Sequence, residues 1–122
     1  MLQTTLLNVK KSLENNSKLN NKQIELLVDN MELWDLNHIV YPSQIKSMLF
    51  IKYKSVYEVL DVIRDLGILE YNYQIYCSKC ERFLDKKILR SLNEFPEVLY
   101  CDENHKLKSL EDTILIYRVI KE

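Results

Sequence analysis

The three cysteines of this chain form a paired pattern with one of its histidines. Cys77 and Cys80 are separated by two residues, and Cys101 and His105, separated by three, follow a spacer of 20 residues. A turn of the first length brings two thiolates to one point, and Cys101 with His105 supplies a second pair. The pattern therefore predicts that two distant points of the chain meet.

Three thiolates and one imidazole make a ligand set that suits Zn²⁺ in a tetrahedral site. Protein fills all four positions, so no position is left for water or substrate, and a closed site of this kind is structural rather than catalytic. We therefore expect one structural Zn²⁺ per chain, bound by Cys77, Cys80, Cys101 and His105. Two other interpretations stay open, in which the cysteines are buried as small hydrophobes or Cys77 and Cys80 form a redox pair.

Composition limits the class of protein. With 122 residues, 47% of them hydrophobic and 29% charged, the chain fits one domain or one domain with a small insert. A net charge of −1 argues against a polycation built for nucleic acid. No apolar run approaches the ~20 residues of a membrane span, and the N-terminus does not resemble a signal peptide. We therefore expect a cytoplasmic protein.

Nothing in the sequence predicts catalysis. No carboxylate pair, glycine-rich phosphate loop or nucleophile with a matched base can be identified. His38 lies in a connection between predicted helices, where a surface or capping role fits it better than chemistry. We expect a protein that is not an enzyme.

The N-terminal segment carries an apolar stripe. Leu2, Leu6, Val9 and Leu13 follow one another at spacings of four, three and four residues, which predicts a short helix over residues 2–14. The stripe fits either packing on the domain's own core or a homodimer contact, and it is too short to indicate a coiled coil.

Three further helices are expected before the cysteines, over residues 21–36 with Asn21 as N-cap, Pro42–Ile51 and Ser55–Leu66. Proline suits the first turn of the second helix, because the N–H that it lacks would be unpaired there. Ser55 and Glu58 match a capping box for the third. Gly67 supplies a left-handed residue after its last turn.

The second half of the chain predicts strands. Residues 68–76 and 113–120 alternate β-branched and aromatic side chains, so we expect two strands that pair antiparallel. Between the cysteine pairs we expect a short helix near residues 84–92, begun by Asp85, and a short strand over Glu97–Tyr100 that leads into Cys101.

Three helices, the last two joined by a tight turn, followed by two strands resemble a winged helix-turn-helix. The resemblance rests on this order and on Leu66-Gly67-Ile68-Leu69 at the exit of the third helix. It implies an α+β fold, a winged helix-turn-helix of three helices plus a β-ribbon. Residues 1–18 would form an N-terminal helix, residues 19–76 plus 112–122 the winged-helix body, and residues 77–111 a structural zinc segment inserted at the wing. Winged helices joined to zinc ribbons occur in archaeal and eukaryotic general transcription factors, which gives the pairing a precedent by analogy.

Two functions follow from the resemblance. In DNA-binding winged helices the helix after the turn enters the major groove, but the outward residues expected here include Glu58, Asp61 and Asp65, which do not suit phosphate. We therefore expect either DNA binding related to transcription, or a protein-interaction adaptor in a larger assembly that uses tyrosines and the acidic tail. The residues expected to contact DNA or a protein partner are Lys52, Lys54, Tyr57, Arg64, Lys79, Arg82, Lys86 and Lys87, although basic residues 79–90 equally fit a solvated surface.

Overall fold

A computed structural model describes the backbone of all 122 residues and every side chain except those of Asp85 and Lys86. The chain divides into two compact units. Unit 1 contains Met1–Glu70 and Tyr117–Glu122, and unit 2 contains Tyr71–Ile116. Among the described residues, no helix is both long enough and apolar enough to cross a membrane.

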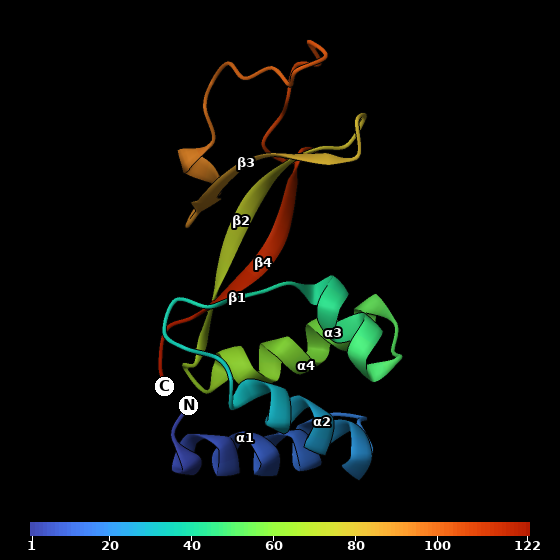
Figure 1. Cartoon of the computed structure of the whole chain (residues 1–122), viewed down its shortest axis with the longest axis vertical. Helices are drawn as coiled ribbons and strands as arrows, with labels where there is room; N and C mark the ends of the chain where they lie inside the picture. The colour runs from blue at the N-terminus through green and yellow to red at the C-terminus, as the bar shows by residue number, and fades with distance from the viewer. The chain divides into compact units, whose positions relative to one another are not determined.

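Unit 1 is built from four helices that pack on one another (Figure 1). Helix α1 packs on α2 and α4, and α3 packs on α2 and α4 as well. Each helix buries one apolar face, as the spacing of its hydrophobic residues predicts. The helices are α1 (Gln3–Asn16), α2 (Asn21–Met31), α3 (Pro42–Leu49) and α4 (Tyr53–Asp65).

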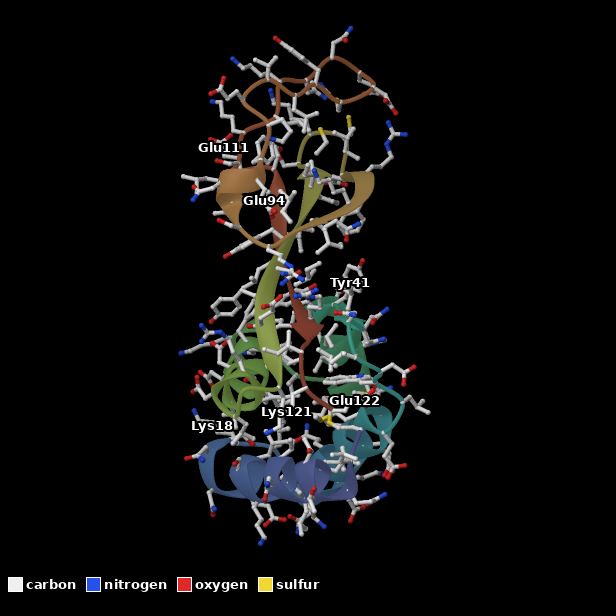
Figure 2. The ribbon with its side chains drawn as sticks, turned by 90° about the vertical axis from the view of Figure 1, so that its left-hand side faces the viewer. Lys18, Tyr41, Glu94, Glu111, Lys121 and Glu122 are labelled. Carbon is white, nitrogen blue, oxygen red and sulfur yellow. The ribbon has the colours of Figure 1, made fainter. Side chains whose placement is uncertain are left out.

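The N-terminal stripe serves the core of unit 1. Leu6, Val9 and Leu13 are buried, whereas Leu2 lies at the N-cap of α1 and is exposed, so the predicted stripe is wrong at its first residue. Thr5 of α1 donates a hydrogen bond of 3.0 Å to the carbonyl of Glu122, which lies beside the helix in Figure 2. A homodimer contact through α1 remains a proposal, and it would have to use other side chains than the three that are buried.

The structure corrects two predicted helix starts. The N-cap of α2 is Asn20 rather than Asn21, because the Asn20 side chain accepts from the backbone N–H of Gln23 and the Gln23 side chain accepts from that of Asn20. Helix α4 begins at Tyr53, so Ser55 lies inside its first turn and the predicted capping box is wrong. The α3–α4 connection has the predicted length of three residues but lies two residues earlier, since the chain leaves α3 through the left-handed backbone of Phe50 (φ 55°).

Four strands form one sheet in the order β1-β4-β2-β3. The N–H of Ile120 donates to the carbonyl of Ile68 and the N–H of Tyr76 donates to that of Asp112, so β2 and β4 run antiparallel. This confirms the predicted strand pair, to which the short β1 adds an unpredicted third strand along β4. The strands are β1 (Ile39–Val40), β2 (Leu69–Cys77), β3 (Arg82–Leu89) and β4 (Thr113–Val119).

The helix expected near residues 84–92 is wrong, since this segment contains strand β3. The turn after Cys77 places Arg82 opposite it, and β3 then pairs with β2 as far as Leu89 opposite Tyr73. Pairing with a neighbouring strand therefore overrides a local pattern that fits a helix as well. A single 3₁₀ turn, Leu92–Glu94, follows, and the strand predicted over Glu97–Tyr100 is reduced to one bridge between Tyr100 and Lys106.

Gly67 allows a test of the left-handed backbone that follows the C-terminal end of α4. It has φ 80°, its N–H bonds to the carbonyl of Arg64, and a Cβ at this position would meet no atom within 4 Å. Gly67→Ala should therefore lower the free energy of unfolding by about 1–2 kcal/mol through backbone strain alone. Urea unfolding measures the loss. Gly67→Asn is the control and should lose less, because asparagine tolerates the left-handed region, and equal losses in both variants would contradict the explanation.

Candidate metal centre

Four side chains of unit 2 converge on one point. The Nδ1 atom of His105 lies 3.2 Å from the sulfurs of Cys80 and Cys101 and 3.7 Å from that of Cys77, and the sulfurs of Cys80 and Cys101 are 3.7 Å apart. All four ligand atoms lie within 4.8 Å of one another. Figure 2 shows sulfur atoms, in yellow, gathered in this unit. These four residues, which are the predicted ligands, could hold a metal ion.

The distances fit a tetrahedral ion. With metal–sulfur bonds of ~2.3 Å and a metal–nitrogen bond of ~2.0 Å, the edges of the tetrahedron would be roughly 3.8 Å between sulfurs and roughly 3.5 Å from sulfur to nitrogen. Four of the six separations between the donor atoms are 3.2–3.7 Å, close to these values, and none of the six exceeds 4.8 Å. A single ion would therefore reach all four donor atoms with little movement of the chain.

Two tight turns present the ligands. The N–H of Cys80 points at the Cys77 sulfur at 3.4 Å, and the N–H of His105 points at the Cys101 sulfur at 3.3 Å. Each turn contains one residue with a left-handed backbone, Glu81 (φ 55°) in the first and Asn104 (φ 62°) in the second. The turns thus aim backbone donors at sulfur, which favours the thiolate form that a metal ion needs.

The thiols differ in how readily they ionise. Burial opposes the ionisation of Cys101, but the backbone N–H groups of His105 and Glu103 donate toward its sulfur, and the pKa of Cys101 falls to about 7. Burial raises the pKa of Cys80 to about 12, and hydrogen bonds with two neighbouring thiols and Glu103 act in the same direction. Three sulfurs this close cannot all carry negative charge unless a cation lies among them, and a dication would meet that need.

An ion pair lies at the rim of the centre. The guanidinium of Arg82 lies 3.6 Å from the carboxylate of Glu103, which also accepts from the Cys80 thiol at 3.5 Å. The interaction with Cys80 contributes most to a raised pKa of Arg82, so this positive charge faces the sulfur ligands. Arg82 therefore places a positive charge beside the sulfurs, and the contact with DNA or a partner expected for it stays a prediction.

Asp112 fastens the first turn to the chain that follows the second. One carboxylate oxygen accepts from the N–H and the hydroxyl of Ser78, at 3.0 and 2.8 Å, and the other accepts from the N–H of Lys108 at 2.8 Å. Ser78 directly follows Cys77, so this buried carboxylate fixes the position of a ligand without touching the metal point. The donated hydrogen bonds outweigh burial and lower the pKa of Asp112.

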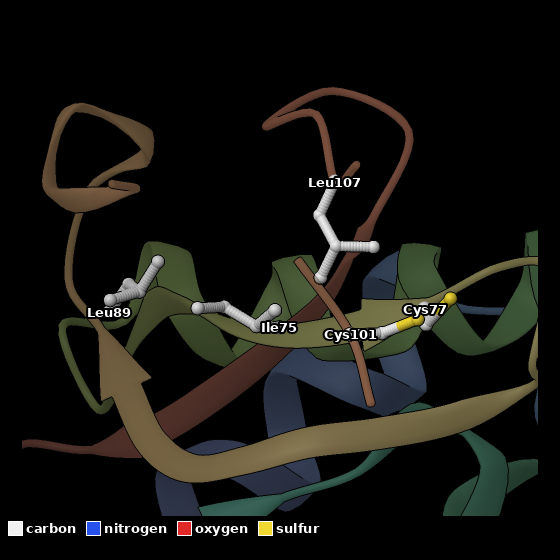
Figure 3. Packing of buried hydrophobic residues seen from close by; sticks show 5 residues of the cluster. All are labelled: Ile75, Cys77, Leu89, Cys101 and Leu107. Carbon is white, nitrogen blue, oxygen red and sulfur yellow. The ribbon is translucent and has the colours of Figure 1, made fainter. Parts of the chain in front are cut away.

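A small apolar cluster lies under the centre (Figure 3). Its buried members are Ile75, Cys77, Leu89, Cys101 and Leu107, so two of the ligands are also core residues of unit 2. The cavity that borders the three thiols has a volume of about 60 Å³. Small-molecule sites usually have ~300–1,000 Å³, so the space beside the cysteines does not fit a substrate.

The eight residues predicted to contact DNA or a partner divide between the units. Lys52 and Lys54 are exposed at the start of α4, Tyr57 is half-buried and stacks on Tyr53, and Arg64 pairs with Asp65 at 3.8 Å. In unit 2, Lys79, Arg82 and Lys87 are exposed, and the side chain of Lys86 lies outside the described residues. His38 is exposed and stacks on Trp34, in agreement with the surface position expected for it.

The sequence did not predict the roles of two residues, Asp112 and Phe50. Asp112 lies seven residues from His105, the nearest predicted ligand in sequence, and no local pattern marks it as a partner of Ser78. Phe50 directly follows a buried leucine, so the sequence suggests one more helical residue rather than an exposed aromatic ring.

Comparisons of the chain with protein-family models, with curated proteins and with solved structures found no match. Its role is therefore argued from its own residues.

The contacts of Asp112 predict how stability depends on pH. The pKa of Asp112 lies below the usual 3.8. The carboxylate therefore stabilises unit 2 fully at pH values above 3.8, and this stabilisation is lost as the pH falls through the lowered pKa. Asp112→Asn leaves a buried N–H without its acceptor and should cost about 1–3 kcal/mol of unfolding free energy. The loss, measured by denaturant unfolding, should be the same at pH 7 and pH 5.

Glu111→Gln is the matched control, because Glu111 is the exposed neighbour of Asp112 and should change stability little. A loss in Asp112→Asn that already shrinks between pH 7 and pH 5 would mean that burial dominates and that the pKa is raised instead.

Proposed function

We propose that this chain is a non-enzymatic DNA-binding protein that contains one structural Zn²⁺ ion. Three sulfurs and one imidazole nitrogen at near-tetrahedral distances support zinc, because this set suits Zn²⁺ better than the oxygen-preferring Mg²⁺ and Ca²⁺. The ion would supply a positive charge and a cross-link between Cys77, Cys80, Cys101 and His105. All four positions would be filled by protein, so the role of the ion would be structural.

We propose that the helical part is a winged helix-turn-helix. The support is the order of elements, in which α2 is followed by β1, then by α3 and α4 joined at a tight turn, and then by the antiparallel pair β2 and β4. The sheet order, with β1 along β4 and β4 beside β2, fits the same arrangement. Helix α4 would then be the recognition helix, and the metal-binding segment would occupy the place of a wing loop.

The observation that carries DNA binding is the charge around the α3–α4 turn. Residues 36–57 contain three lysines, Lys46, Lys52 and Lys54, and no aspartate or glutamate. Lys52 and Lys54 are exposed in the first turn of α4 and its cap. Recognition helices contact base edges through their N-terminal residues, and lysines there contribute the counterion release that dominates affinity for DNA.

The structure weakens one argument against DNA binding. Asp61 of α4 is half-buried and accepts a 2.9 Å hydrogen bond from the hydroxyl of the buried Tyr117, so its carboxylate is engaged by a contact within unit 1. Asp65 is paired with Arg64 at the far end of the helix. Of the three carboxylates of α4, these two are thus engaged by contacts within unit 1, while Glu58 stays exposed four residues after Lys54.

A protein-interaction adaptor is the second candidate. Leu26, Leu33 and Leu36, within and after α2, are exposed, Leu33 to 76%. Exposed aliphatic residues of this kind are typical of a docking surface when they form one patch. An adaptor would use this face rather than the lysines, so variants at the two places distinguish the candidates.

The zinc proposal predicts the metal content of the purified protein. Elemental analysis should give about one zinc per chain. His105→Asn and Cys80→Ser should lose the metal and destabilise unit 2, because a protein ligand is removed. His38→Asn is the matched control, since the other histidine is exposed and remote from the cysteines in sequence, and it should keep its zinc. A metal-free protein in which Cys80→Ser folds normally would support buried thiols instead.

The DNA proposal predicts a salt-dependent affinity. Fluorescence anisotropy against duplex DNA should show binding whose log K falls linearly with log salt concentration, and replacing Lys52 and Lys54 by glutamine should reduce the slope by about 0.9 per lysine. Lys18→Gln with Lys22→Gln removes the same charge before and at the start of α2 and should leave the slope unchanged. If DNA binding is absent or does not depend on salt, the adaptor is favoured. Partner capture then tests the adaptor, and Leu33→Asn should capture less of the partner than the wild type.

A further inference from the structure

Phe50 is placed where an aromatic residue is costly. Its backbone is left-handed (φ 55°), a conformation that usually selects glycine or asparagine after a helix. Its side chain is 91% exposed, so burial of the ring does not offset the strain. An unfavourable backbone combined with an exposed ring indicates that this residue has a use outside the fold.

The surroundings of Phe50 combine aromatic rings with positive charge. An open groove of about 950 Å³ is lined by Lys46, Ser47, Phe50, Ile51, Lys52, Tyr53 and Ser55. The groove has two lysines and no carboxylate among its lining residues. It is therefore complementary to a polyanion that also carries flat, apolar groups.

The second ring of the groove is held in place. Tyr53 is 47% exposed and stacks on Tyr57, with ring centroids 6.3 Å apart, and the Lys46 ammonium lies 5.4 Å from the Tyr53 ring centroid. A ring held by two neighbouring side chains loses little freedom when a ligand contacts it. Tyr53 thus provides an ordered ring beside the freely accessible ring of Phe50.

Unpaired nucleotides have the chemistry that fits this groove. Proteins that bind single strands combine a positive groove for the backbone with aromatic side chains on which bases stack. Inside a duplex each base already stacks on both of its neighbours, so Phe50 has no base face to contact there. We propose that the α3–α4 turn binds DNA in which unpaired bases adjoin a duplex, with the lysines on the backbone and a base stacked on Phe50. This inference rests on the DNA-binding function proposed above and names its substrate class.

The test compares three labelled DNAs of one sequence by anisotropy: a blunt duplex, the same duplex with a single-stranded overhang, and the single strand. The wild-type chain should bind the overhang DNA more tightly than the blunt duplex. Phe50→Asn should weaken binding to the overhang DNA by about 5- to 150-fold, as loss of one base stack predicts. Its binding to the blunt duplex and its salt dependence should not change, because every lysine is kept.

The variant is chosen so that folding does not obscure the result. Asparagine suits the left-handed backbone of position 50, so Phe50→Asn should unfold at the wild-type denaturant concentration or above it. Leu33→Asn is the matched control, since it also removes an exposed apolar side chain of unit 1. It should bind all three DNAs as the wild type does. A 2-aminopurine base in the overhang should lose fluorescence on binding to the wild type and keep it with Phe50→Asn.

Four outcomes would overturn the inference. If Phe50→Asn binds the overhang DNA like the wild type, or if the wild type binds blunt and overhang DNA equally, the inference fails while the proposed DNA-binding function stands. If Phe50→Asn weakens the blunt duplex equally, the ring contacts paired DNA and the substrate class is wrong. If the wild type binds none of the three DNAs, the inference fails together with the proposed function.

Discussion

The convergence of three sulfurs and one imidazole nitrogen is the constraint on which unit 2 depends. The buried apolar cluster of this unit has five members, and two of them are the ligands Cys77 and Cys101. So few apolar side chains contribute little to folding on their own, whereas a structural zinc ion contributes about 10–16 kcal/mol of apparent binding free energy in small peptides. The carboxylate of Asp112 holds the first ligand turn in register with Lys108, so the polar contacts and the ligand geometry support each other.

Unit 1 is held by a different interaction, the burial of four amphipathic helix faces. Its side-chain hydrogen bonds fix how these helices meet: Gln23 of α2 donates to the carbonyl of Leu49 at the end of α3, and Tyr117 of β4 donates to Asp61 of α4. Such contacts leave the α3–α4 turn free to carry an exposed aromatic residue, because the stability of the unit comes from elsewhere. Backbone strain such as that at Phe50 persists only where the surrounding structure is stable enough to maintain it.

The two candidate functions use different surfaces of unit 1. Nucleic-acid binding would use the lysines and rings at the α3–α4 turn, and a protein adaptor would use the leucines within and after α2. The hydrogen bond from Tyr117 to Asp61 favours nucleic acid, since it engages one of the carboxylates of α4 on which the objection to DNA rested, while Glu58 remains exposed. The metal centre itself does not distinguish between the two, because a structural ion serves either.

The sequence by itself determined the four residues that could hold a metal ion, the helical first half and the strand pair of residues 68–76 and 113–120. Ligand spacing, a 3.6-residue period and strict alternation are local signals that depend on residue type alone. Only the tertiary structure decided that residues 82–89 form a strand, that Asp112 holds Ser78 and that Phe50 is exposed at a left-handed turn. Each of these depends on contacts between residues distant in sequence or on backbone geometry at a helix end, and neither is recorded in the order of nearby side chains.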